Sequence, residues 1–448
     1  LEGVGRVDRH RVREVLARGK ELGGLEGSEA AVLMGVSDPE LLSELFGAAR
    51  GVKEEIYGRR LVVFAPLYIS NLCYNECLYC AFRARNQAVR RRVLSQEEIV
   101  GETRSLIEQG HKRLLLVAGE AYPEEGFSYV LKSIETIYNT TSGAGEIRRV
   151  NVNVAPLTVE EFKQLKAAQI GTYQLFQETY HHQTYKQVHL RGKKRDYDWR
   201  IDALDRAMEA GIDDLGIGVL FGLFDWRFEI LALLGHIKHL EEKFGVGPHT
   251  ISVPRLEPAA GSELATHPPY PVSDIDFRKI VAILRLAVPY TGIIMSTRET
   301  PNIRRETFAL GVSQISAGSR TNPGGYVEAE QEAEGSQFSL GDHRSLDEVI
   351  RDVAELGYIP SFCTGCYRLG RTGADFMELA KPGEIKNHCD PNGFSTFLEY
   401  LLDYGSDETC QVGEKLIAES LVRMDEPQRE RTNQLLEKVR AGERDVFC

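Results

Sequence analysis

The chain has 448 residues, of which 42% are hydrophobic and 27% charged, and its formal net charge is −12 at pH 7. This balance is that of an ordinary globular protein with room for one large domain and a smaller one. The acidic charge argues against a nucleic-acid partner. We see no apolar stretch long enough for a membrane span and no secretory signal. Eight cysteines in such a chain indicate reduced thiols available for metal, so we expect a cytoplasmic location and no membrane partner.

Residues 1–57 predict an N-terminal helical cap. Apolar residues recur at helical spacing over 9–18, 28–34 and 39–57. Nothing in this segment indicates chemistry.

From Leu61 onward, β-rich runs alternate with amphipathic helical patterns. Strands are expected at about 61–68, 113–119, 148–155, 172–178, 213–219, 249–255, 292–297 and 312–318. Helices are expected at 95–109, 126–138, 158–168, 198–210, 227–243, 273–287, 301–310 and 345–356. This α/β order predicts a (β/α)8 barrel of the TIM type over residues 58–358, with an open doubly wound sheet as the alternative.

One alternate set of residues on the predicted strands is polar or small. In 150–155 the valines alternate with Asn151 and Asn153, and in 215–219 apolar residues alternate with Gly216 and Gly218. The set continues with Ser252, Ser296, Arg298, Gln314, Ser316, Gly318 and Arg320. Because barrel strands point alternate side chains inward, we predict a polar lumen that can hold substrate. The alternative is that these side chains only satisfy one another.

Three cysteines follow the first predicted strand. Cys73, Cys77 and Cys80 are separated by three and then two residues. Three thiolates can hold three irons of a [4Fe–4S] cluster and leave the fourth iron open to a small molecule. Zinc is the alternative, but zinc sites usually supply four ligands in paired spacings. A loop after a barrel strand lies at the C-terminal mouth, where barrel active sites are found.

A second set of three cysteines lies in the C-terminal segment. Cys363 and Cys366 are separated by two residues, and Cys366 and Cys389 by twenty-two. The set predicts a second [4Fe–4S] cluster, with a zinc site that includes His388 as the alternative. We expect residues 359–448 to form a mostly helical auxiliary iron–sulfur domain. Its helices are predicted at about 394–403, 410–423 and 426–440.

Barrel topology separates the two cysteine sets. The helix at 345–356, capped by Ser345 with Glu348 three residues on, follows the eighth strand and returns to the opposite mouth. Cys363 and Cys366 come shortly after it, so the second set is predicted at that mouth. His249 opens the sixth strand and lies at the same mouth. The sequence alone favours a buried structural histidine there, with an additional metal ligand as the alternative.

The spacing Cys-x3-Cys-x2-Cys, with Tyr79 before the last cysteine, resembles the signature of radical S-adenosylmethionine (SAM) enzymes. The resemblance implies that the open iron binds the amino and carboxylate groups of SAM. One electron then splits SAM into methionine and a 5′-deoxyadenosyl radical.

Further stretches resemble the tyrosine lyases of that superfamily, the ThiH and HydG group. They are 64–68, 171–180, 216–222, 251–255 and 296–299. The C-terminal cysteine motif is similar to that of the HydG branch, the maturases of [FeFe]-hydrogenase, and is absent from the thiazole branch. The resemblance implies cleavage of the Cα–Cβ bond of L-tyrosine to p-cresol and dehydroglycine. Carbon monoxide and cyanide would then form at the second cluster.

The resemblance also implies an additional iron on the second cluster, held by His249 and linked through a free cysteine. An Fe(CO)(CN) unit would be released for assembly of the hydrogenase H-cluster. The implied partners are the other hydrogenase maturation proteins, an iron–sulfur GTPase scaffold and a second radical SAM maturase.

Individual residues follow from the same resemblance. Cys73, Cys77 and Cys80 match the catalytic cluster ligands, and Cys363, Cys366 and Cys389 match those of the second cluster. Gly119 and Glu120 resemble the element that meets the methionine amino group of SAM, with Ala118 in place of a glycine. Glu178 matches a residue that holds the polar end of SAM. The expected cofactor-binding set is completed by Asn153, Gly216, Gly218 and Ser319.

Two arginines are candidates for the catalytic clamp on the tyrosine carboxylate. Arg298 and Arg320 lie near the ends of the seventh and eighth predicted strands, and a guanidinium matches a carboxylate bidentately. The alternative for either is an internal salt bridge.

Two other functions stay open at this point. A 2-iminoacetate synthase of thiazole biosynthesis, which stops at dehydroglycine, needs no second cluster. A non-catalytic iron–sulfur scaffold needs no SAM site.

Overall fold

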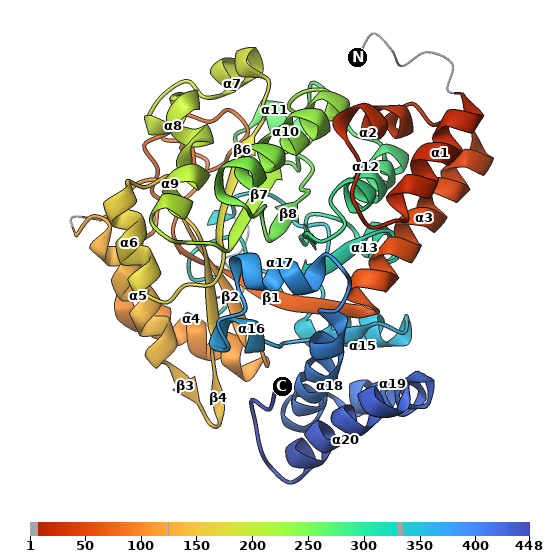
Figure 1. Ribbon diagram of the computed structural model, residues 1–448. Helices are drawn as coiled ribbons and strands as arrows, with labels where there is room; N and C mark the ends of the chain where they lie inside the picture. The colour runs from red at the N-terminus through yellow and green to blue at the C-terminus, as the bar shows by residue number, and fades with distance from the viewer. Residues whose placement is uncertain (1–7, 124, 329–334) are drawn as a thin grey trace.

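Eight parallel strands close into a barrel in the computed structural model, which describes residues 8–123, 125–328 and 335–448 (Figure 1). The strands are β1 (Arg60–Ser70), β2 (Arg113–Ala118), β5 (Arg149–Asn153), β6 (Tyr173–Glu178), β7 (Leu215–Val219), β8 (Thr250–Ser252), β9 (Gly292–Met295) and β10 (Val312–Ser316). β10 pairs with β1 in parallel, with Ile315 opposite Val63. This closure confirms the predicted (β/α)8 barrel and excludes the open sheet.

The helices that cover the barrel lie where the sequence patterns predict them, and all but α9 begin within two residues of a predicted start. They are α4 (Gln96–Glu108), α5 (Ser128–Asn139), α6 (Val159–Ala167), α8 (Tyr197–Ile201), α9 (Ala203–Glu209), α10 (Trp226–Phe244), α12 (Asp274–Ala287), α13 (Pro301–Phe308) and α15 (Leu346–Glu355). Ser345 caps α15 as predicted, since its hydroxyl accepts from Glu348 N–H at 3.3 Å. The single helix expected at 198–210 is two helices, which meet at Asp202.

Short elements that the sequence analysis did not identify fill the connections. They are the hairpin β3 (Thr141–Ser142) and β4 (Gly145–Glu146), α7 (His182–Val188), the 3-10 turn η1 (Lys193–Arg195) and α11 (Glu263–Thr266). α7 and α8 lie at the top of Figure 1, beyond the ends of the strands β6 and β7.

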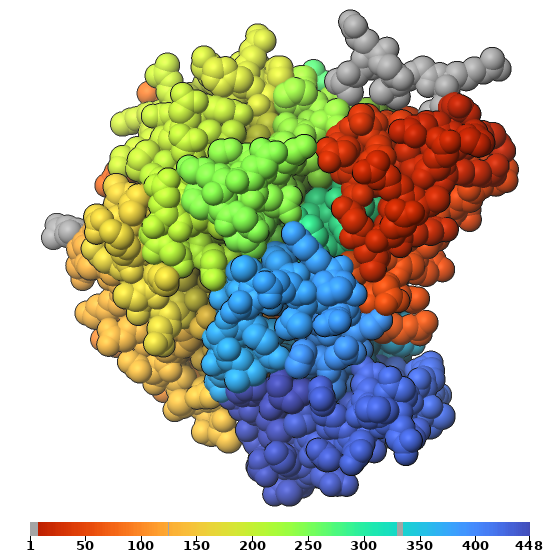
Figure 2. All heavy atoms as spheres, viewed as in Figure 1, coloured from red at the N-terminus to blue at the C-terminus, as the bar shows by residue number. Residues whose placement is uncertain are grey.

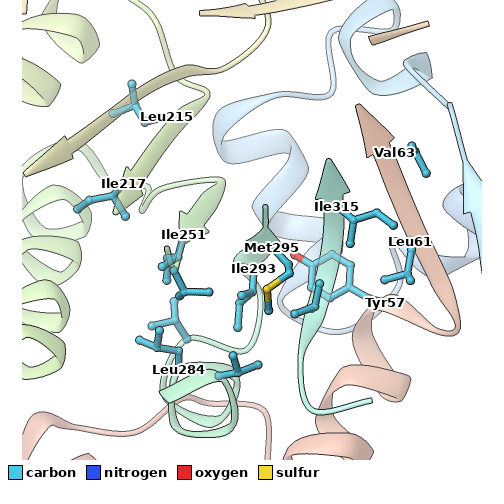
Figure 3. Close-up of a cluster of buried hydrophobic side chains, with 14 of the residues drawn as sticks. Tyr57, Leu61, Val63, Leu215, Ile217, Ile251, Leu284, Ile293, Met295 and Ile315 are labelled. Carbon is cyan, nitrogen blue, oxygen red and sulfur yellow. The ribbon is translucent and has the colours of Figure 1, made fainter. Parts of the chain in front are cut away.

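The outward side chains of the strands form the main core. Leu61, Val63, Ile251, Ile293 and Ile315 are each fully buried, and they point toward the surrounding helices (Figure 3). Burial of one such side chain contributes about 1.5–3 kcal/mol. The predicted outward set of Val, Ile and Leu is therefore confirmed, and it leaves the inward set free to build sites.

The inward set is less polar than predicted. Asn153, Ser252, Ser296 and Ser316 do line a central cavity. Apolar side chains share that lining, namely Phe64, Leu115, Val117, Phe176 and Ile294. The predicted polar set lies on strands that are rich in small and polar residues. The strands β1, β2 and β6 instead contribute large apolar side chains to the lining. The lumen is mixed rather than polar.

The N-terminal cap consists of α1 (Arg9–Gly19), α2 (Gly27–Met34) and α3 (Pro39–Tyr57), as predicted. α3 packs along α12 on the side of the barrel (Figure 1). Its last residue, Tyr57, donates from its hydroxyl to the carbonyl of Tyr290, which ties the cap to the barrel.

The C-terminal segment begins with β11 (Ile359–Ser361), which pairs in parallel with the start of β1. The helices that follow are α16 (Gly365–Arg368), α17 (Gly373–Ala380), α18 (Lys386–Asp403), α19 (Asp407–Arg423) and α20 (Glu426–Arg440). In Figure 2 the light-blue residues near 360–380 lie across the barrel face turned to the viewer. The division into domains at 57 and 358 stays a prediction.

One helix boundary in this segment is a correction. α18 begins at Lys386 rather than at 394, so Cys389 lies on a helix and not on a loop. Pro391 and Gly393 both disfavour a helix interior. Buried packing overrides that preference, since Pro391, Asn392 and Gly393 are all buried. No helix of the described residues is long and apolar enough to cross a membrane.

Candidate active site and second cysteine site

A large cavity opens at the C-terminal ends of the strands, and we call it the upper cavity. Its space, part of which is open to solvent, is about 1460 Å³. Cys73, Cys77 and Cys80 all line it. Its lining combines these thiols with apolar side chains and a few charged ones, which is typical of a small-molecule site.

The cysteine loop is held by its own backbone and by the segment after α7. Cys80 N–H donates to Cys77 O at 3.0 Å, and Leu78 N–H donates to Val188 O at 2.9 Å. The hydroxyl of Tyr79 contacts His189 Nε2 at 2.8 Å. His189 Nδ1 lies 2.9 Å from the Tyr185 carbonyl, which can only accept. Nδ1 therefore carries the proton, and Tyr79 donates to Nε2.

The surroundings of these three thiols favour the thiolate form only when a positively charged group is bound. Burial, followed by the nearby Glu120 and Cys80, raises the pKa of Cys73 to about 11. Burial also raises the pKa of Cys77 and of Cys80. Without a metal these thiols stay protonated at neutral pH, whereas bound irons would supply the charge that holds thiolates. Their role as cluster ligands stays a prediction that this setting supports.

Gly119 lets the end of β2 approach the cysteine loop. A Cβ atom at this position would lie 2.0 Å from the carbonyl oxygen of Leu72, the residue before Cys73. The Gly119 N–H also donates to Ser70 O at 2.9 Å. Only a glycine fits here without moving the loop.

Replacing Gly119 by alanine is expected to displace the cysteine loop. Because the clash is with backbone, the change is expected to cost about 1–3 kcal/mol of unfolding free energy, as overpacking does. It should also raise the KM for SAM. Urea unfolding and the SAM dependence of 5′-deoxyadenosine release measure the two effects. Gly23→Ala is the control, since Gly23 is exposed and no atom lies within 4 Å of a Cβ placed there. An unchanged KM for SAM would contradict the expected displacement.

A network of four charged side chains lies beside the cysteine loop. Glu120 accepts from Asn75 Nδ2 at 2.5 Å and from Arg200 at 3.0 Å. Glu178 accepts from Lys194 Nζ at 2.6 Å. Although burial opposes ionisation, Arg200 and Lys194 lower the pKa of Glu120. The carboxylate of Glu120 is therefore charged beside the cavity, and Glu178 is paired with Lys194.

Lys194 and Arg200 were missed by the sequence analysis. Both line the upper cavity. They belong to a charged run, 193–200, that reads as a solvated helix start, and no local signal distinguishes its buried members. The one usable hint was their position, shortly after the predicted site residue Glu178.

Glu178 has a left-handed backbone conformation, with φ of 71°. Such a conformation is uncommon for a non-glycine residue and needs support from its surroundings. The support comes from Glu229 on α10, whose carboxylate accepts from the Thr179 hydroxyl and from Tyr180 N–H at 2.8 Å. Glu229 thus anchors the turn that aims Glu178 into the cavity.

Replacing Glu229 by glutamine is expected to flatten part of the pH dependence of stability. Burial raises the pKa of Glu229 from 4.5 to about 7. Because the folded chain keeps this proton to higher pH, its stabilising contribution is complete below pH 4.5 and disappears as the pH rises through 7. The loss is on the order of 3 kcal/mol. Urea unfolding of both proteins at pH 5 to 8 measures it, and parallel curves would contradict the expectation.

The two candidate arginines lie in different places. Arg298 lines the upper cavity, and its guanidinium carbon lies 3.2 Å from the ring centroid of Phe338. Burial lowers the pKa of Arg298. Arg320 is not among the lining residues, and it donates to the backbone of Ser319 at 3.2 Å. Ser319 is also outside the lining, with its hydroxyl buried and unpartnered within the described residues.

Of the remaining residues predicted to bind the cofactor, one lines the upper cavity and two do not. Asn153 lines the upper cavity, and its amide donates to Gln174 O at 3.0 Å. Gly216 and Gly218 do not line it. A Cβ at Gly218 would lie 2.6 Å from the ring of Phe176, and one at Gly216 would lie 2.6 Å from Gln174. These glycines make room for neighbouring side chains, and direct contact with SAM remains an untested prediction for them.

A second cavity lies at the N-terminal ends of the strands, and we call it the lower cavity. Cys363, Cys366 and Cys389 line it together with His249. Its space is about 570 Å³. β11 brings the cysteines there, since Ser361 pairs beside Val62 near the start of β1. The two cavities are lined by successive inward residues, Val62 below and Phe64 above.

Unpartnered polar atoms gather around the lower cavity. Among the described residues that line it, the following atoms are buried without a hydrogen-bond partner: Arg60 Nε, Arg113 Nε, both oxygens of Asp214, His249 Nδ1, Thr364 Oγ1 and Arg371 Nε. Buried polar groups in folded proteins are nearly always satisfied. This concentration fits a cavity built to hold a polar or charged group.

The lower thiols include one that ionises readily. A hydrogen bond from Cys366 lowers the pKa of Cys389 and raises that of Cys366, while burial raises the pKa of Cys363. Within the described residues, no three His, Cys, Asp or Glu side chains converge to hold one metal ion, as a zinc site requires. A [4Fe–4S] cluster takes one thiolate per iron and does not need that convergence.

The chain matches the model of the Radical SAM superfamily over residues 67–234 and that of the Biotin and Thiamin Synthesis associated domain over residues 252–359. It is 33% identical to the 2-iminoacetate synthase of Escherichia coli over 74% of this chain and 85% of the relative. The closed barrel, the cysteine loop at its C-terminal mouth and these matches define a radical SAM enzyme. Membership implies SAM and a [4Fe–4S] cluster as cofactors.

The solved structures narrow the family. The crystal structure of HydG, a maturase of the [FeFe]-hydrogenase, is 51% identical, covers 100% of this chain and 97% of that chain, and has a TM-score of 0.96. HydG from Carboxydothermus hydrogenoformans is 43% identical over 97% and 96% of the two chains, with a TM-score of 0.84. The chain belongs to the HydG family of radical SAM tyrosine lyases.

Proposed function

We propose that this chain cleaves L-tyrosine with SAM in the upper cavity and forms carbon monoxide and cyanide in the lower one. The product would be an Fe(CO)(CN) unit for the H-cluster of [FeFe]-hydrogenase. One observation carries the proposal: a chain of the HydG family has three cysteines around each of two cavities at opposite ends of one barrel.

In the upper cavity, Cys73, Cys77 and Cys80 would hold a cluster with one open iron. The reduced cluster with SAM supplies the radical that removes a hydrogen atom from tyrosine. Glu120 and Glu178 pair with Arg200 and Lys194 and present carboxylates that can orient the polar end of SAM. Gly119 allows the backbone at the end of β2 to approach the cysteine loop closely.

Arg298 would bind the tyrosine carboxylate. It lines the cavity, and Phe338 stacks on its guanidinium, so the donors are held in one orientation. A bidentate pair of this kind fixes both position and direction of a substrate. Tyr68 and Phe82, in an edge-to-face contact at 6.0 Å, cover the same cavity and help to exclude water from the reacting groups.

In the lower cavity, Cys363, Cys366 and Cys389 would hold the second cluster, and His249 would hold the additional iron. Arg60, Arg113 and Arg371 also line this cavity. Their positive charge suits anionic thiolates and cyanide. Dehydroglycine released above would reach this cavity through the barrel.

A maturase needs recipients for its product. We include the other hydrogenase maturation proteins, an iron–sulfur GTPase scaffold and a second radical SAM maturase, as partners in the proposal.

The reconstituted and reduced protein tests the first half of the proposal. Incubation with SAM and L-tyrosine is expected to release 5′-deoxyadenosine and p-cresol together, measured by chromatography. Omission of tyrosine should remove p-cresol. A protein with intact clusters that releases no 5′-deoxyadenosine would refute the enzyme function and favour a scaffold.

The similarity to 2-iminoacetate synthase supports a second candidate, a lyase that stops at dehydroglycine. The two candidates differ in their final products. Cyanide and carbon monoxide in the same reaction favour the maturase, whereas p-cresol and glyoxylate without them favour the second candidate.

A further inference from the structure

Asp214 is a buried acidic residue in the lower cavity that has no assigned role. It lies directly before β7, lines the cavity and is 3% exposed. Neither of its carboxylate oxygens has a hydrogen-bond partner within the described residues. Burying an unpaired carboxylate is costly, so a fold retains one chiefly where another group comes to pair with it.

His249 is a titratable residue that lies close to this carboxylate. Its Nδ1 lies 3.9 Å from Asp214 Oδ2, and Nδ1 is itself buried without a partner. The imidazole ring packs on Phe376, with the ring centroids 4.2 Å apart. A small tilt of the ring would close the remaining gap to hydrogen-bond distance. Two unsatisfied groups thus face each other.

Two of the three arginines that line the cavity make hydrogen bonds away from Asp214. Arg113 donates to Cys363 O at 2.7 Å and lies over the ring of Tyr367. Arg371 donates to Cys448 O at 2.9 Å. Within the described residues, Asp214 has no ion pair with either of these guanidinium groups. Its charge is available to His249.

We propose that Asp214 accepts the Nδ1–H of His249 and thereby holds the tautomer that presents Nε2 to the additional iron. The inference rests on the proposed function, in which His249 holds that iron. Metal-ligating histidines usually donate their other ring N–H to a carboxylate, a carbonyl or a water, which fixes the ring and raises its basicity. Asp214 is then a positioning residue, which acts on the metal through His249.

Iron binding tests the inference without relying on turnover. Wild type and variants are reconstituted with both clusters, treated with a chelator to remove labile iron, and titrated with Fe²⁺ in a calorimeter. Asp214→Leu, which removes the acceptor and keeps the volume similar, is expected to weaken Fe²⁺ binding about 10–100-fold. Asp214→Asn keeps an acceptor oxygen and is expected to lose less.

Two variants serve as references. Asp213→Leu changes the neighbouring residue, which is exposed and contacts Thr372 Oγ1 at 3.2 Å, and it is expected to bind Fe²⁺ like wild type. His249→Ala is expected to lose the site. Circular dichroism and urea unfolding show that each variant is folded.

The outcomes separate the inference from the function on which it rests. If Asp214→Leu binds Fe²⁺ like wild type while His249→Ala does not, the role of Asp214 is refuted and that of His249 stands. If His249→Ala binds like wild type, the proposed ligand is wrong and the inference falls with it. Weak binding in Asp214→Leu, intermediate binding in Asp214→Asn and normal binding in Asp213→Leu support the inference.

Discussion

Replacing Cys363, Cys366 and Cys389 together by alanine is expected to leave p-cresol formation intact and to abolish the release of carbon monoxide and cyanide. The upper and lower cavities share no lining residue, so removing the lower thiols leaves the SAM and tyrosine groups in place. Dehydroglycine would then leave the enzyme and hydrolyse. The measurement is p-cresol by chromatography, together with cyanide and carbon monoxide from the same reaction.

A fourth cysteine provides the control for this experiment. Cys410 on α19 lies outside both cavities, and its thiol donates to Leu401 O at 3.1 Å. Cys410→Ala is expected to make all the products of wild type. Cyanide release that survives the triple substitution would refute a role for the second cysteine set.

Replacing Arg298 by alanine is expected to raise the KM for tyrosine about 10–100-fold, the effect of losing a charged hydrogen-bond donor worth about 1.5–3 kcal/mol. The KM for SAM should change little. Arg298→Lys is expected to recover only part of the loss, because an ammonium cannot bind a carboxylate bidentately. The KM values come from the initial rates of p-cresol formation.

Arg320 is the matched comparison, since it is the other arginine proposed from the sequence. It does not line the upper cavity, so Arg320→Ala should leave the KM for tyrosine nearly unchanged. A large rise in that KM for Arg320→Ala, with none for Arg298→Ala, would reverse the assignment.

The barrel could be predicted because each of its strands and helices is specified by residues that are neighbours in the sequence. Each strand is a short β-rich run between turns, and each helix has its own apolar stripe and cap, as at Ser345 and Glu348. β11 could not be predicted in this way. It has three residues, and it is a strand only because the start of β1 is available to pair with it.

The cysteines of the site could be found because their spacing is itself the signal. Side chains that reach the cavities from elsewhere give no such signal. Lys194, Arg200 and Asp214 are each charged residues in ordinary surroundings along the chain, and only the closure of the barrel brings them to the cavities that the cysteines line. At Gly216 and Gly218, neighbouring side chains fill the space beside the backbone, which the small residues alone do not reveal, and their contact with SAM stays a prediction.

The central claim is that one chain holds two clusters, of which only the upper one meets SAM. Electron paramagnetic resonance of the reconstituted, reduced protein tests it directly. Two cluster signals are expected, and adding SAM should shift only one of them. In the variant without Cys363, Cys366 and Cys389, only the SAM-sensitive signal should remain. A single signal in the fully loaded wild type, or two signals that both respond to SAM, would contradict the account.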